Sequence, residues 1–100
     1  MQKPNIPLKI IVIGLGHQSL DDHIPAIMSS ERFVLSGVVD IDEDRAKLFG
    51  EAESIPYASS VGALLESMTE KPDGALVAVP HSDYLPIITE LANNRIHIIK

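Results

Sequence analysis

Apolar and polar positions follow two different periods along this chain. Five short runs rich in Val, Ile and Leu are typical of buried strands, and the segments between them carry the spacing of amphipathic helices. The expected strands cover residues 8–13, 34–39, 55–57, 75–79 and 96–99. The expected helices cover residues 23–29 (with a start as early as Ser19), 43–50, 61–68 and 82–93. Strands that alternate with helices in this way predict a parallel α/β sheet.

Capping and turn residues set the expected ends of these elements. Asp42 is an expected N-cap, and Gly50 is an expected stop for the helix that Asp42 begins. Ser59 or Ser60 caps the next helix, which we expect to turn its apolar side inward. Pro56 lacks a backbone N–H, so it places the third strand at an edge of the sheet.

The first strand runs directly into Gly14-Leu15-Gly16-His17-Gln18. A glycine allows the tight turn after such a strand, and a second lets the backbone approach a pyrophosphate at the start of the next helix. The third small position of this fingerprint is Ser19 rather than Gly or Ala. The pattern predicts a Rossmann-type doubly wound sheet in three α/β/α layers, with strand order 3-2-1-4-5 and a dinucleotide on this turn.

The second strand ends at Asp40, close to the separation from Gly14 at which such folds place an acid on the ribose hydroxyls. A carboxylate there repels a 2′-phosphate, so NAD is the expected cofactor in preference to NADP. Arg45, one helical turn later, would moderate that preference. A structural interpretation also stands: Asp40 ends the strand and helps to cap the following helix.

Six segments occur in the order typical of one enzyme family. They are Gly14-Leu15-Gly16, His23-Ile24-Pro25-Ala26-Ile27, residues 40–46, 55–59, Val79-Pro80-His81-Ser82-Asp83-Tyr84, and residues 95–100. In this combination the chain resembles the N-terminal nucleotide-binding domain of the Gfo/Idh/MocA oxidoreductases. The resemblance implies NAD(P)-dependent oxidation or reduction of a sugar, polyol or related small molecule. It implies cofactor contacts at Gly14, Leu15, Gly16, His17, Gln18, Asp40, Ile41, Val79, Pro80, His81 and Tyr84.

The chain departs from the family pattern at two positions, and it stops short of a third motif. Val79-Pro80-His81 stands where the family usually has Thr-Pro-Asn, and Tyr84 stands where it has His. We expect His81 and Tyr84 beside the nicotinamide half of the cofactor. The family's catalytic Lys lies in a Glu-Lys-Pro triplet that would begin just after Lys100, so no catalytic residue is assigned. The resemblance implies that residues 1–100 are one nucleotide-binding domain without the substrate domain, and inactive alone.

Composition argues against several other classes of function. The 14 acidic residues outnumber the 8 scattered basic ones, giving a net charge of −6, which does not suit nucleic acid or anionic lipid. Cysteine is absent, which excludes disulfides and thiolate sites, and the four histidines lack the spacing of metal ligands. No apolar run is long enough to span a membrane and no signal peptide is evident, so we expect a cytoplasmic protein.

Two other functions remain open, and so does self-association of the chain. A fold of this kind also binds S-adenosylmethionine, and it also serves as a non-catalytic nucleotide sensor.

The polar lead-in at residues 1–7 is expected to be mobile. The fifth strand is expected to form a bare edge with Ile96, Ile98 and Ile99 poorly covered, which leaves self-association into a homo-oligomer open.

Overall fold

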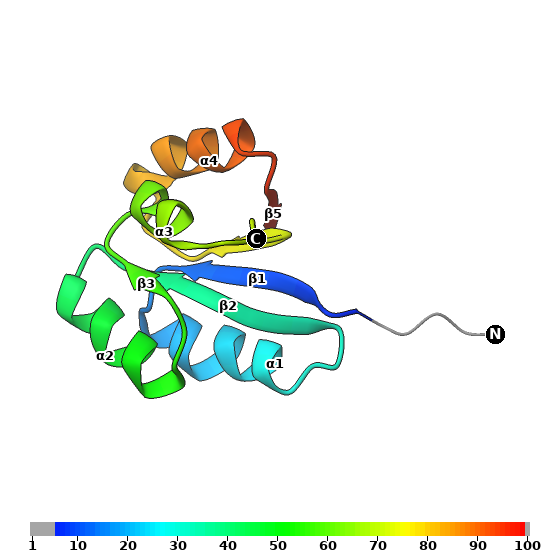
Figure 1. Cartoon of the computed structure of the whole chain (residues 1–100). Coiled ribbons are helices and arrows are strands. Elements are labelled where there is room, and N and C mark those ends of the chain that lie inside the picture. Colours follow the sequence, from blue (N-terminus) through cyan, green and yellow to red (C-terminus); the bar gives the residue numbers. More distant parts are fainter. Residues whose placement is uncertain (1–5, 100) are drawn as a thin grey trace.

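A five-stranded parallel sheet lies between two layers of helices (Figure 1). The computed structural model describes residues 6–99, so Lys100 and the lead-in at residues 1–5 lie outside the described residues. The elements are β1 (Leu8–Ile13), the π-helical turn η1 (Ser19–His23), α1 (Ile24–Met28), β2 (Phe33–Val39), α2 (Glu43–Glu53), β3 (Tyr57–Ala58), α3 (Val61–Ser67), β4 (Gly74–Val77), the 3-10 turn η2 (His81–Asp83), α4 (Tyr84–Asn93) and β5 (His97–Ile99).

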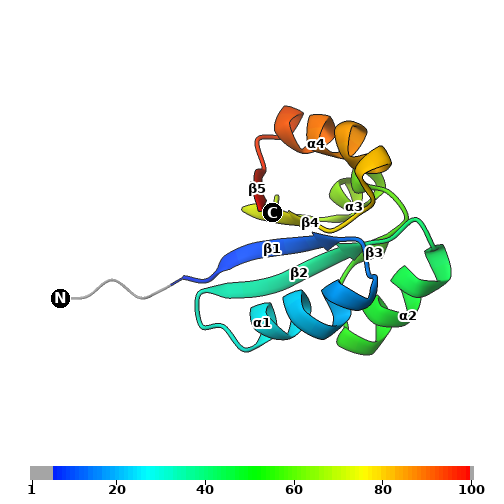
Figure 2. The same ribbon diagram turned by 180° about the vertical axis from the view of Figure 1, so that it is seen from behind.

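The strand order β3-β2-β1-β4-β5 confirms the expected doubly wound arrangement. β1 pairs with both β2 and β4, and all the pairings are parallel. Helices α1 and α2 cover one face of the sheet and α3 and α4 cover the other, as the two opposite views show (Figures 1 and 2). The winding direction reverses between β1 and β4, and such reversals open a crevice at the carboxyl ends of the strands.

Alternate residues of β1 supply the centres of two cores, one on each face of the sheet. Ile11 and Ile13 pack with Leu64 and Leu91 on the side of α3 and α4. Ile10 and its neighbours on the opposite face pack under α1 and α2. The four buried positions of β1 therefore alternate between the two faces with the strand period of two, and they carry Ile or Val because helices cover both faces.

The helix that Asp42 caps runs three residues beyond the expected stop at Gly50. The Asp42 carboxylate accepts a hydrogen bond from the Arg45 N–H at 3.1 Å, which confirms the cap. Gly50 is buried, and a Cβ atom there would lie 2.4 Å from the Tyr57 ring. Gly50 therefore provides room for β3 rather than a helix end, and α2 ends at Glu53, followed by Ser54 with a positive φ of 57°.

Three of the expected strands also have different bounds in the structure. The edge strand β3 begins at Tyr57, because Pro56 has no N–H to donate and contributes only its carbonyl, which accepts from the Val38 N–H. β4 ends at Val77 rather than Val79, since its partner β1 ends at Ile13. Strand β2 starts one residue earlier than expected, at Phe33.

The ends of the last βαβ unit also differ from expectation. The helix expected over residues 82–93 begins as the tight turn η2 and continues as α4. Ile96 is not poorly covered: it is buried against the α3 and α4 side of the sheet, and β5 starts after it. Ile98 and Ile99 are half-buried at the edge, and self-association there stays a prediction.

The first turn after the glycine loop contains a buried polar atom without a partner. The Ser19 side chain is 1% exposed, which agrees with a small residue packed between helix and strand. Its Oγ atom has no hydrogen-bond partner within residues 6–99. A buried hydroxyl left unpaired lowers stability by about 1–3 kcal/mol.

We expect Ser19→Ala to raise the free energy of unfolding by about 1 kcal/mol, because it removes the unpaired hydroxyl from a helical position. Urea denaturation followed by circular dichroism measures the change. The control is Ser60→Ala, which should lower stability by about 1 kcal/mol. The Ser60 hydroxyl accepts the Ala63 N–H at 3.2 Å and so caps α3. A less stable Ser19→Ala variant would contradict the assignment.

Arg95→Gly is expected to raise stability by up to about 1 kcal/mol. Arg95 follows the C-terminus of α4 with φ at 58°, a left-handed conformation that costs a side-chain-bearing residue about 1–2 kcal/mol and that glycine adopts freely. The control is Ala92→Gly in the same helix, which should lower stability by about 1 kcal/mol. Thermal melts of the two variants should therefore shift in opposite directions.

Candidate functional site

A pocket of about 620 Å³ opens at the carboxyl edge of the sheet, over the reversal between β1 and β4. Its walls come from the glycine loop, the end of β2, the start of α3 and one side of α4. Six of the residues expected to contact a cofactor line it: Gly14, Gly16, Asp40, Ile41, Val79 and Pro80. The carboxyl-edge location agrees with the position at which doubly wound sheets bind ligands.

The two glycines of the loop have different geometric roles. Gly14 has φ at +100°, and a Cβ atom there would lie 2.2 Å from the Ala78 carbonyl oxygen, so any side chain would force β1 and β4 apart. Its N–H donates to the Val39 carbonyl at 2.7 Å. Gly16 is exposed, and nothing lies within 4 Å of where its Cβ would be. The loop therefore leaves bare backbone open to a ligand, which fits the pyrophosphate of a dinucleotide.

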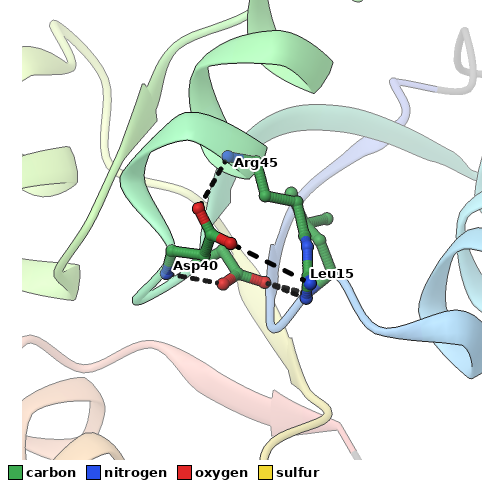
Figure 3. A network of polar contacts seen from close by, with 4 residues as sticks. Leu15, Asp40 and Arg45 are labelled. Carbon is green, nitrogen blue, oxygen red and sulfur yellow. Dashed lines mark hydrogen bonds and ion pairs between the residues drawn. The ribbon is translucent and has the colours of Figure 1, made fainter.

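The Asp40 carboxylate joins the glycine loop to the end of β2 (Figure 3). Its Oδ2 atom accepts the Leu15 N–H at 2.7 Å, and its Oδ1 atom accepts the Asp42 N–H at 2.8 Å. The side chain is 6% exposed, and the Arg45 guanidinium lies 3.7 Å from Oδ2. Asp40 thus orders the turn into α2, as the structural interpretation expected; its contact with a ribose stays a prediction.

The remaining residues of the loop lie around the pocket rather than in its wall. The Leu15 side chain is 1% exposed and packs into the core beneath α1, so only its backbone belongs to the loop surface. His17 and Gln18 are exposed outside the pocket. The Leu20 N–H donates to the Gly16 carbonyl at 3.0 Å, which begins the helical turn directly after the loop.

His81 and Tyr84 line a different pocket. Their rings stack with centroids 5.9 Å apart and planes inclined by 21°. Together with Leu85, Ile88 and Ile98 they border a second pocket of about 480 Å³ between α4 and β5. The structure therefore places Val79 and Pro80 beside Asp40 but turns His81 and Tyr84 toward β5.

One side of α4 belongs to the first pocket and was not expected there. Asp83, Pro86, Ile87 and Glu90 recur at helical spacing along this side, opposite Ser60 at the start of α3. The signal was present in the sequence, because residues at i, i+3, i+4 and i+7 share one helix face. The two acidic members of this face distinguish it from a stripe that only packs on a core.

Residues 6–99 lack two features of other functional classes. This part of the chain contains no group of three His, Cys, Asp or Glu side chains placed to hold a metal ion. None of its helices combines the length and apolarity needed to cross a bilayer.

Several solved dehydrogenases and reductases share this fold. D-galactose-1-dehydrogenase from Rhizobium etli matches with a TM-score of 0.81 and 17% identity, over 99% of this chain and 29% of its own. The 3-ketoreductase KijD10 from Actinomadura kijaniata, solved with NADP and TDP-benzene, matches with a TM-score of 0.81 and 22% identity, over 94% and 28%. The WlbA dehydrogenase from Bordetella pertussis, solved with NADH and UDP-GlcNAcA, gives 0.80 and 21%, over 93% and 28%.

The chain therefore spans less than a third of each of these three proteins. A comparison with curated proteins gave no match. The model of the GFO_IDH_MocA oxidoreductase family, NAD-binding Rossmann fold, matches residues 8–100, which is nearly the whole chain. With the glycine loop, the buried acid and the strand order in agreement, this chain belongs to the Gfo/Idh/MocA oxidoreductase family, as its NAD(P)-binding Rossmann domain.

Proposed function

We propose that this domain binds NAD in preference to NADP. We further propose that the whole protein uses the cofactor to oxidise or reduce a sugar, polyol or related small molecule. The observation that carries the cofactor proposal is the buried Asp40 carboxylate, which ties the glycine loop to the end of β2 at one wall of the pocket. The relatives solved with NADP and with NADH support a dinucleotide and leave the choice between the two to the residues of this chain.

Backbone and side-chain groups around the loop would hold the cofactor. The pyrophosphate would lie on the N–H groups of the loop and of the helical turn after it, where the helix dipole favours negative charge. The adenosine ribose would lie at Asp40 and Ile41. The nicotinamide half would extend past Val79 and Pro80 toward His81 and Tyr84. When bound, the nicotinamide supplies the hydride chemistry. The residues that would contact the cofactor are Gly14, Leu15, Gly16, His17, Gln18, Asp40, Ile41, Val79, Pro80, His81 and Tyr84.

The charges at the end of β2 favour NAD. Each carboxylate oxygen of Asp40 accepts one backbone N–H and keeps a further lone pair for a ribose hydroxyl. Among residues 6–99, Arg45 is the one cationic side chain in the wall of the pocket, and it lies within 4 Å of both Asp40 and Asp42. The two carboxylates therefore already neutralise the charge of Arg45. The 2′-phosphate of NADP would be repelled by Asp40 and Asp42.

Titration calorimetry with NAD and NADP tests this preference. Asp40→Ser is expected to weaken NAD binding about tenfold or more, because it removes a charged acceptor and releases the Leu15 N–H. The matched control is Asp42→Ser, which removes a neighbouring charge but keeps an oxygen that can cap α2, so NAD binding should stay within about threefold. Equal affinity of the parent chain for the two dinucleotides would refute the NAD assignment.

Arg45→Ala provides an independent check on the same discrimination. The substitution removes the cation that the described part of the chain contributes to the pocket wall. We expect NADP to lose more affinity than NAD, so that the ratio in favour of NAD rises about threefold or more. A fall in this ratio would show that Arg45 serves NAD itself and that the charge argument is wrong.

A thermal-shift series identifies the class of ligand. A ligand that binds only the folded chain raises its melting midpoint. We expect NAD and NADH to raise the midpoint at concentrations at which S-adenosylmethionine does not. A rise with S-adenosylmethionine and none with any dinucleotide would overturn the proposed function.

A further inference from the structure

The end of the pocket between α3 and α4 contains a carboxylate without a partner. Glu90 is half-buried and lines the pocket. Its Oε2 atom lies so close to Gly62 that a Cβ atom there would be 2.8 Å away. Within residues 6–99 the structure gives the Glu90 carboxylate no hydrogen bond and no ion pair, since the cation of the pocket, Arg45, lies beside Asp40 and Asp42 instead.

The surroundings of this carboxylate suit a flat ring with a polar edge. Pro86 and Ile87 precede Glu90 on the same side of α4, and Val79 faces the same space from the chain after β4. These side chains offer apolar surface, and Glu90 adds one ionised group. An ionised carboxylate only accepts hydrogen bonds, so it is complementary to a ring that presents N–H groups.

We propose that Glu90 accepts a hydrogen bond from the amino group at C6 of the adenine ring, so that the pocket prefers adenine to hypoxanthine. This inference rests on the proposed function, which supplies the dinucleotide. At C6 adenine presents an exocyclic amino donor, whereas hypoxanthine presents a carbonyl acceptor there and carries its N–H donor on the neighbouring N1. A carboxylate that faces C6 attracts the amino group and repels the carbonyl, and sites built on a hydrogen bond discriminate strongly against analogues that lack it.

A purely structural role for Glu90 makes a different prediction. Gly62 is in the first turn of α3, and a negative charge near a helix N-terminus stabilises the helix. In that case Glu90→Gln would lower the melting midpoint and leave base selectivity unchanged. Base selectivity is therefore the measurement that separates the two roles.

The test is titration calorimetry of the full 100-residue chain with NAD and with its deaminated analogue, nicotinamide hypoxanthine dinucleotide. We expect the parent to bind NAD about tenfold or more tightly than the analogue. Glu90→Gln should bring the two affinities within about threefold, because a glutamine amide can accept from the amino group or donate to the carbonyl. The matched control is Glu66→Gln, an exposed carboxylate of α3 outside the pocket, which should keep the parent preference.

Gly62→Ala tests the placement of the carboxylate without changing it chemically. The new methyl group would require the end of the Glu90 side chain to move, and alanine is favoured at a helical position, so the chain should fold. We expect a reduced preference for NAD. Combining Gly62→Ala with Glu90→Gln should reduce it no further, because both changes act on one contact.

The possible results distinguish a failure of the role of Glu90 from a failure of the proposed dinucleotide binding. Binding of both dinucleotides with equal affinity by the parent, or an unchanged preference in Glu90→Gln, overturns the role of Glu90 while the proposed function stands. Failure of the parent to bind either dinucleotide overturns both. A lost preference in Glu90→Gln with the Glu66→Gln control intact supports the inference.

Discussion

The pair of hydrogen bonds that Asp40 accepts is the constraint on which the site depends. A buried carboxylate is unfavourable unless its lone pairs find donors, and here two backbone N–H groups from different parts of the chain provide them. One donor belongs to the loop after β1 and the other to the turn after β2. The carboxylate therefore holds two neighbouring strand ends in a fixed relation, and the pocket takes its shape from that relation.

The central position of β1 explains why the pocket lies where it does. β1 has β2 on one side and β4 on the other. The helix that follows β1 and the helix that follows β4 lie on opposite faces of the sheet (Figures 1 and 2). No crossover covers the gap between those helices. Gly14 closes the bottom of this gap by packing its backbone against the Ala78 carbonyl, which leaves the top open for a ligand. The fold class thus determines where the pocket lies, and the contact between Gly14 and Ala78 determines where its floor is.

The sequence was most informative where a pattern reflects local chemistry. Buried strands, the glycine turn and the acid at the end of β2 each depend on backbone geometry or solvent exclusion, so residue type predicted the strand order together with Gly14, Gly16 and Asp40. The family resemblance added the other three expected residues that line the pocket. Gly50 was misread, because glycine also serves where a distant aromatic ring needs space, and only the fold shows the ring of Tyr57.

Helix α4 shows why the rest of the site was harder to predict. The chain after β4 first makes a 3-10 turn, and the direction of each later side chain depends on where that turn ends. His81 and Tyr84 consequently face β5, while Pro86 and Glu90 line the pocket at the carboxyl edge of the sheet. A pattern of apolar residues fixes the side of a helix that packs on a sheet. It does not say which of the two remaining sides meets a ligand.

Because α4 forms a wall of both pockets, a shift of this helix would change the shape of both. The helix is anchored to the core by Leu91, which is fully buried, and it presents different sides to the two spaces. A molecule that displaces the helix from one side changes the shape of the other pocket. Linkage makes this effect mutual: whatever the first occupant does to the affinity of the second, the second does equally to the first. A single short helix would then transmit cooperativity between neighbouring ligands without any rearrangement of the sheet.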